Sequence, residues 1–223
     1  MALDPSVLPH VIDNASISTD GRAYPQIRKE LRTIPSFRNA WSVAWMFGQN
    51  ILILAIAVRL DSLAVWVIAF LLMGRMHAQF ASLMHEAAHR LLFRHRGAND
   101  WVGNWLLGYP VITSTPAYRR VHMAHHREEF GPNEPDIPLY ANYPITRDSF
   151  WRKMRRDALG ISGFKMLRGQ FRHPLRKDGF GKRTQAKILA TQLVLLVAIS
   201  LVSHPLVYVA FWFIPQLTVW RVM

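Results

Sequence analysis

The chain has 223 residues, of which 51% are hydrophobic, and its 27 basic and 14 acidic residues give a formal net charge of +13. It contains no cysteine, which excludes disulfides, thiolate-bound iron–sulfur clusters and a thiol nucleophile. Most of the basic residues lie between Arg90 and Lys187 or between Arg22 and Arg38, beside apolar runs. We therefore expect the positive charge to face membrane lipids at the cytoplasmic side, and we expect no nucleic-acid partner.

The chain begins with a polar segment and continues into two apolar runs. Residues 1–40 are interpreted as a cytosolic N-terminal arm with no secretory signal, and a membrane domain is expected over residues 41–223. Residues 41–58 carry no charge and can form a slightly short transmembrane helix. A turn at Arg59–Asp61 then precedes a second span at residues 62–84.

The second span is expected to continue as one helix from Ser62 to His89, even though Arg75 interrupts the apolar run. Such a helix is about 42 Å long, whereas the hydrocarbon core of a bilayer is about 30 Å thick. Its last two turns should therefore stand outside the membrane. Those turns carry His85 and His89 on one helix face.

The sequence His85-Glu86-Ala87-Ala88-His89 allows two interpretations. It is a two-histidine helical face that can bind a metal. It also matches the HExxH pattern, in which two histidines hold zinc and the glutamate acts as a base in metalloproteases. The pattern is short, so it does not decide between them.

Residues 90–187 form a long basic connection, which we expect to be a cytosolic helical cap. Residues 101–113 are apolar but are interrupted by glycine and proline, which predicts an interfacial or re-entrant segment. Pro116 favours the start of a helix that carries residues 118–127. A proline-rich turn follows at residues 131–138, and residues 147–187 are expected to form a basic helix or two.

The predicted helix over residues 118–127 contains a second histidine cluster, His122, His125 and His126. Together the two clusters supply five imidazoles, more than the three protein ligands of a typical catalytic zinc site. This number suits a binuclear centre. Nitrogen ligands alone are compatible with iron, copper, zinc or nickel.

The chain closes with an uncharged stretch that His204-Pro205 divides into two expected spans, at residues 188–203 and 206–220. The sequence thus predicts an all-α, polytopic membrane protein with four transmembrane helices in two hairpins. The distribution of basic residues places both termini and the long loop in the cytoplasm. Both histidine clusters then share one side of the membrane.

The HxxxH box followed by the sequence YRRVHMAHH at residues 118–126, between two apolar hairpins, resembles the integral-membrane fatty acid desaturase superfamily. This superfamily includes lipid hydroxylases and carotenoid ketolases, and the resemblance covers roughly residues 41–223. It implies four transmembrane helices beneath a cytosolic cap that holds two irons. The implied iron ligands are His85, His89, His122, His125 and His126.

The resemblance also implies the reaction. A site of this family activates O2 with electrons from a small redox protein, such as a ferredoxin or a cytochrome b5-like protein, and removes hydrogen from a lipid acyl chain. The family has a third histidine box after the fourth span, which these 223 residues do not contain. We therefore expect the chain to be a fragment, inactive alone, whose second iron is completed by residues beyond Met223; loss of the second metal is the alternative.

Desaturation is the favoured activity, and hydroxylation or ketolation within the same superfamily is the nearest alternative. Two alternatives come from other classes. A membrane zinc protease would use Glu86 as its base. In a non-catalytic membrane protein, the histidines would bind a metal for structure or bind none. In the desaturase interpretation, Glu86 is a supporting partner of the ligands. The basic stretch at residues 151–156 is expected to contact anionic lipid rather than an acidic electron carrier.

Several polar residues outside the two boxes are given ordinary structural roles. His95 and His173 are expected to be solvated surface residues, and His204 to cap a turn. A place for His77 along the substrate path is the less favoured interpretation. Glu134 and Asp136 are expected to belong to a solvated acidic turn rather than to orient a box histidine.

Overall fold

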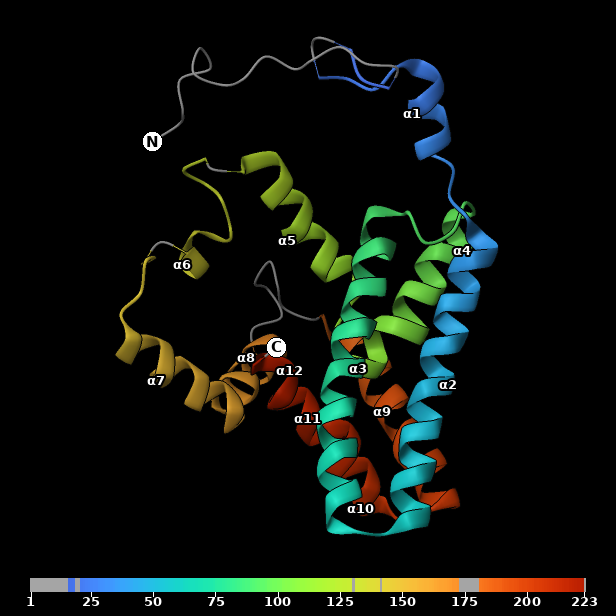
Figure 1. Ribbon diagram of the computed structural model, residues 1–223, viewed down its shortest axis with the longest axis vertical. Helices are drawn as coiled ribbons and strands as arrows, with labels where there is room; N and C mark the ends of the chain where they lie inside the picture. Colours follow the sequence, from blue (N-terminus) through green and yellow to red (C-terminus); the bar gives the residue numbers. More distant parts are fainter. Residues whose placement is uncertain (1–15, 19–20, 130, 141, 173–180, 223) are drawn as a thin grey trace. The chain divides into compact units, whose positions relative to one another are not determined.

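The computed structural model describes residues 16–18, 21–129, 131–140, 142–172 and 181–222, and every regular element in these ranges is a helix (Figure 1). The expectation of an all-α chain is confirmed. The chain divides into two units, Met1–Pro35 and Ser36–Met223. The first unit contains α1 (Pro25–Leu31), and the second contains all the elements described below.

Two long helices form the first hairpin of the second unit and lie side by side in Figure 1: α2 (Ser36–Leu60) and α3 (Leu63–His89). The turn between them is tight because Asp61 adopts a positive φ of 41°. The Ser62 hydroxyl then caps α3 by accepting a hydrogen bond from the Val65 backbone N–H at 3.4 Å. The prediction of one unbroken helix reaching His89 is confirmed.

The segment after α3 is helical but irregular. It runs through α4 (Arg96–Trp101), the π-helical η2 (Val102–Gly108) and the 3-10 turn η3 (Tyr109–Val111). Gly103 lets η2 approach α3 closely, because a Cβ there would lie 2.8 Å from the Ala87 methyl group. The segment had been predicted to be interfacial or re-entrant, and its close packing against α3 is compatible with either.

The irregular turns of η3 leave backbone carbonyls that regular helices would have satisfied. Side chains from later elements donate to these carbonyls. Gln192 Nε2 donates to the carbonyls of Tyr109 and Pro110 at 2.7 and 3.0 Å. Trp212 Nε1 also donates to Pro110 O at 3.0 Å, and Gln216 Nε2 donates to the next carbonyl, that of Val111, at 2.7 Å. These bonds tie η3 to the C-terminal part of the chain.

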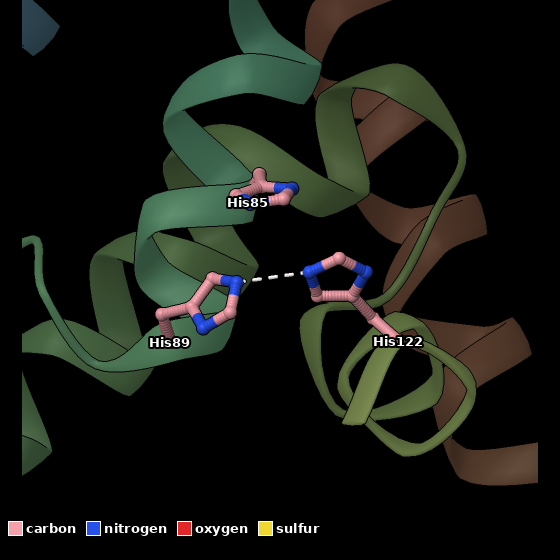
Figure 2. A group of neighbouring side chains, drawn as sticks. All are labelled: His85, His89 and His122. Atoms are coloured by element: carbon pink, nitrogen blue, oxygen red, sulfur yellow. Dashed lines mark hydrogen bonds between the residues drawn. The ribbon is translucent and has the colours of Figure 1, made fainter. Parts of the chain in front are cut away.

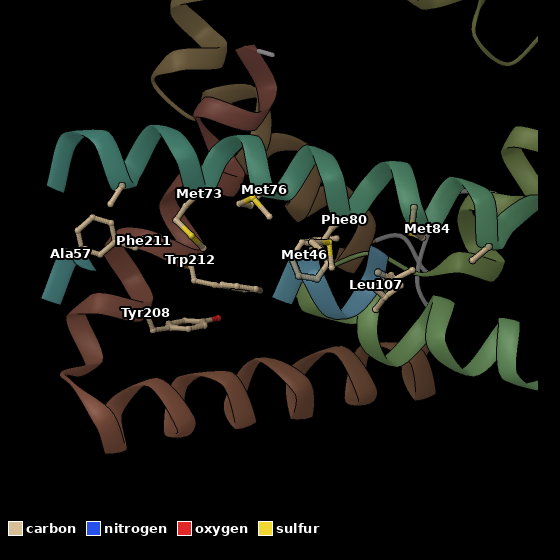
Figure 3. Close-up of a cluster of buried hydrophobic side chains, with 14 of the residues drawn as sticks. Met46, Ala57, Met73, Met76, Phe80, Met84, Leu107, Tyr208, Phe211 and Trp212 are labelled. Atoms are coloured by element: carbon tan, nitrogen blue, oxygen red, sulfur yellow. The ribbon is translucent and has the colours of Figure 1, made fainter. Parts of the chain in front are cut away.

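A core of long, flexible and aromatic side chains lies between α2, α3, η2 and the C-terminal turns (Figure 3). Met46 of α2 and Phe80 of α3 are fully buried, and Trp212 from the C-terminal part packs edge-on against Phe80 with ring centroids 5.7 Å apart. Methionine fills irregular gaps well because its side chain is unbranched. This core fixes the end of α3 against the segment that follows it.

Four further helices occupy the long basic connection: α5 (Thr115–Glu128), α6 (Ile137–Tyr140), α7 (Arg147–Ala158) and α8 (Ile161–Arg172). Proline near the first position opens α5, as predicted. The basic region after residue 147 forms two helices, also as predicted. Gly160, with a φ of 73°, makes the turn between them.

The C-terminal part begins with α9 (Lys182–Val202) and then breaks into short pieces: α10 (Pro205–Val207), η4 (Tyr208–Phe213), α11 (Ile214–Leu217) and α12 (Val219–Val222). Among the described residues, three helical stretches are long and apolar enough to cross a membrane: Pro25–Leu60, Leu63–His89 and Lys182–Val202. The first expected span falls within the first stretch, and the second and third fall within the other two except for one residue each, Ser62 and Ser203.

The fourth expected span does not form one long helix. Its contiguous turns cover residues 205–217, or about 20 Å at the usual rise, which is less than the roughly 30 Å of a hydrocarbon core. The helix is interrupted by a π-helical turn, and Pro215 opens the next short piece. A transmembrane hairpin made from this region is therefore not established by the fold.

Candidate metal centre

The last turns of α3 and the middle of α5 bring the two histidine boxes together (Figure 2). His85, His89 and His122 each offer one nitrogen, and these atoms all lie within 4.8 Å of one another. The Nε2 atoms of His89 and His122 are 2.8 Å apart. Residues more than thirty positions apart in the sequence thus converge on one point.

His126 extends this group, because its Nε2 atom lies 3.1 Å from the Nε2 atom of His122. His122 Nε2 therefore faces two other ring nitrogens, and a single N–H on His122 cannot donate a hydrogen bond to both of them. Two ligand nitrogens at right angles about a metal 2.1 Å away would be about 3.0 Å apart. The spacing and the all-nitrogen donor set fit a transition metal.

The site also favours the neutral form of its central imidazole. Partial burial, followed by the proximity of His85, His126, His89 and His125, lowers the pKa of His122 to about 4. At neutral pH this ring therefore carries no charge. Neutral imidazole is the form that binds a metal.

His125 lies on the same helix but has different partners. Its Nδ1 donates to Glu134 Oε1 at 2.6 Å, and Asp136 Oδ2 lies 3.4 Å from the same nitrogen. Glu134 is only 4% exposed. This hydrogen bond raises the pKa of His125 against the opposing effect of desolvation. The expectation of a solvated turn is wrong for Glu134, because the turn folds back and buries its carboxylate against His125.

Two residues that the sequence interpretation passed over hold the boxes in place. The Tyr118 hydroxyl and His85 Nδ1 are hydrogen bonded at 3.0 Å. Burial raises the pKa of Tyr118, so this hydroxyl stays protonated. Arg119 donates through Nε to the Ala88 carbonyl at 2.7 Å and through one terminal nitrogen to the Ala87 carbonyl at 2.8 Å. Both residues precede His122 on α5, so they fix this helix against the end of α3.

The end of α3 is itself held by several donors. Arg90 ends the helix in the left-handed conformation, with a φ of 62°. The Asn99 side chain donates to the Ala87 carbonyl at 2.9 Å. Asp100 accepts from Arg119 at 2.7 Å and so completes the contact between the two boxes. These hydrogen bonds fix the backbone that carries His85 and His89.

Comparison with known proteins agrees with this geometry. The family model described as fatty acid desaturase matches residues 61–223, which is more than half of the chain and includes both boxes. The chain belongs to the fatty acid desaturase family. No curated protein and no solved structure matches it. The resemblance inferred from the histidine boxes is confirmed.

In this member of the desaturase family, a cavity of about 640 Å³ borders the histidine group. Its wall includes His85, Tyr118 and Thr113, together with apolar atoms of Met84 and Trp220. Glu86 lines the same cavity and is exposed. An apolar chain placed in this cavity would lie beside the first histidine box.

Three other histidines of this desaturase-family chain lie in described residues and make hydrogen bonds within the fold. His95 is exposed and caps α4 by accepting from the Ala98 N–H at 3.1 Å. His204 caps the turn before α10, as predicted, by accepting from the Leu206 N–H at 3.2 Å. His77 is 1% exposed and hydrogen bonds to the Met73 carbonyl at 2.6 Å, so it belongs to the core. His173 lies outside the described residues.

Proposed function

We propose that this chain belongs to a membrane di-iron oxidoreductase that introduces a double bond into a lipid acyl chain, using O2 and electrons from a small redox protein. The observation that carries the proposal is the convergence of imidazoles from the two boxes, with the nitrogens of His85, His89 and His122 within 4.8 Å of one another. Family membership supports an oxidoreductase of the fatty acid desaturase type.

The proposed iron ligands are the five box histidines: His85, His89, His122, His125 and His126. Bound iron would activate O2, which is the oxidant that removal of hydrogen from an unactivated C–H bond requires. The protein's own contribution is to orient the rings. Tyr118 fixes His85 through Nδ1, and Glu134 fixes His125 through Nδ1. A histidine whose second nitrogen is hydrogen bonded presents the other nitrogen to a metal in one orientation.

Three of the four spans in the proposed membrane arrangement are supported by helices long and apolar enough to cross a bilayer. We propose a cytosolic arm at residues 1–40 and a membrane domain at residues 41–223, with four spans at about 41–58, 62–84, 188–203 and 206–220. The loop at residues 90–187 would form the cytosolic cap, with both termini on the same side. In this arrangement the end of α3 that stands outside the membrane holds the boxes at the membrane surface. An acyl chain of the bilayer can reach the adjoining cavity there.

The zinc-protease alternative is less well supported by the geometry. A catalytic zinc commonly has three protein ligands and keeps a position open for water or substrate. Here four imidazoles gather, because His126 adds to the group of three at 3.1 Å from His122. Hydroxylation and ketolation use the same type of centre, so the reaction product has to distinguish them from desaturation.

The test is to express the natural reading frame in membranes with a ferredoxin and its reductase, and to measure bound metal and lipid products together. We expect bound iron, and acyl chains two mass units lighter. His85→Ala and His122→Ala should lose both, whereas His95→Ala should lose neither. Protein that binds zinc but no iron, with a proteolytic activity that Glu86→Gln abolishes, would overturn the proposal.

A further inference from the structure

A second cavity lies on the other side of α8 from the histidine group, between α8, α9 and η4. Its volume is about 570 Å³, within the range of roughly 300–1,000 Å³ typical of small-molecule sites. The wall is almost entirely apolar and includes Phe164, Leu167, Phe171 and Phe213. Among the described residues, no carboxylate lines it.

Two of the polar side chains in the wall, Gln192 and Tyr208, already have partners inside the protein. Gln192 Nε2 donates to the Tyr109 and Pro110 carbonyls, and Gln192 Oε1 accepts from the Tyr208 hydroxyl at 2.7 Å. Apart from the two arginines described next, the wall therefore offers a polar guest no donor or acceptor that is free of a protein partner. Because unpaired polar groups are costly in such surroundings, the cavity suits a hydrocarbon chain.

Two basic side chains belong to the same cavity. Arg168 and Arg172 line it and are exposed, and no ion pair of either is found among the described residues. They lie four positions apart on α8 and so share one helix face. The apolar residues Phe164, Leu167 and Phe171 have the same helical spacing and line the same cavity. One face of α8 therefore combines an apolar surface with two guanidinium groups.

The cavity adjoins a helix that is long and apolar enough to cross a membrane. Ile188, Leu189 and Gln192 in the first turns of α9 form part of its wall. Leu189 is 58% exposed, and Phe164 on the opposite wall is 60% exposed. If α9 crosses the membrane, exposed apolar side chains at its first turns would contact lipid rather than water.

We propose that this cavity binds one anionic phospholipid of the bilayer. The acyl chain would lie along α9 and η4, and the phosphate would pair with Arg168 and Arg172. Guanidinium groups suit a phosphate because they donate two parallel hydrogen bonds. The site is distinct from the cavity at the metal centre, to which α8 contributes Met166 and Gln170. The proposal rests on membrane insertion and not on the proposed reaction.

The test measures lipid bound to the full chain in nanodiscs that contain equal amounts of phosphatidylglycerol and phosphatidylcholine. After mild detergent extraction, native mass spectrometry should find one phosphatidylglycerol retained in preference to phosphatidylcholine. Each basic contact to an anionic lipid is worth about fivefold, so Arg168→Gln with Arg172→Gln should weaken retention by about 25-fold. Lys165→Gln removes a charge from the same helix outside the cavity and should change nothing.

A second pair of variants tests the apolar part of the site without altering charge. Leu189→Trp should fill the cavity and abolish retention. Leu193→Trp, one turn further along α9 and 60% exposed, should retain the lipid. Equal retention of the two lipids, or equal retention by the double arginine variant and Lys165→Gln, would overturn the proposal. So would a dimer that Leu189→Trp dissociates and that carries no lipid, because a second copy would then occupy the cavity.

Discussion

Replacement of Glu134 by glutamine tests whether the buried carboxylate orients a metal ligand. Glutamine keeps the size of the side chain and an acceptor oxygen for His125 Nδ1, but it removes the charge. The hydrogen bond is 2.6 Å long and the Glu134 side chain is 1% exposed, so the bond is charge-assisted and poorly screened. Such bonds contribute about 1.5–3 kcal/mol, against about 0.5–1.5 kcal/mol for neutral ones.

The difference of about 1–1.5 kcal/mol predicts that Glu134→Gln weakens metal binding about tenfold. Glu134→Ala should weaken it by about 10–100-fold, the range found when the partner of a ligand histidine is removed. The assay is competition between the purified protein and a chelator for Co²⁺ or Fe²⁺, followed by absorbance. Circular dichroism shows whether each variant keeps its helices.

Asp136→Asn is the matched control, because Asp136 is 3.4 Å from the same nitrogen and its side chain is 37% exposed. We expect a change of less than about twofold for this solvent-screened contact. If Glu134→Gln and Asp136→Asn bind metal equally well, the buried hydrogen bond does not orient a ligand. His125 would then have no demonstrated part in the centre.

Three further outcomes follow from the structure. Arg119→Lys should lower metal affinity by about tenfold in the same competition assay, since one amine cannot replace a guanidinium that donates to two carbonyls of α3 and to a carboxylate. Gln192→Leu should lower the unfolding midpoint in detergent, because the Tyr109 and Pro110 carbonyls each lose one of two donors and the Tyr208 hydroxyl loses its acceptor, at about 0.5–1.5 kcal/mol for each hydrogen bond. Burial raises the pKa of Asp157, but hydrogen bonds from Lys153 and Ser162 outweigh it and leave this pKa below 3.8. Asp157 therefore stabilises the fold above pH 3.8 and loses this effect as the pH falls through its lower folded pKa. In an acid titration, the free energy of unfolding of Asp157→Asn should change less with pH over that range than the free energy of unfolding of the unchanged protein.

The long helix of the first hairpin could be predicted because its signals are local. Ser62 is a good N-cap and the apolar run resumes after Arg75, so the helix continues to His89. The fourth span was harder to predict, because an uncharged composition shows that a segment is apolar but not that it forms one regular helix. The turns after His204 were expected to form one span, and the structure instead divides them at a π-helical segment and at Pro215.

The same distinction explains which parts of the metal centre could be found in the sequence. The box histidines repeat at three and four positions, and this spacing alone puts each cluster on one helix face. The contact of Glu134 with His125 depends on how the chain turns after α5, and no periodicity encodes that path. Tyr118 and Arg119 belong to the sequence that carries the second box. Their partners lie at the end of α3, where Tyr118 contacts the His85 side chain and Arg119 donates to backbone carbonyls. A ligand can therefore be predicted from its own helix, whereas the residue that orients it becomes visible only when two distant segments are placed together. This is why the chelator competition with Glu134→Gln, rather than removal of a box histidine, tests the part of the centre that the fold itself supplies.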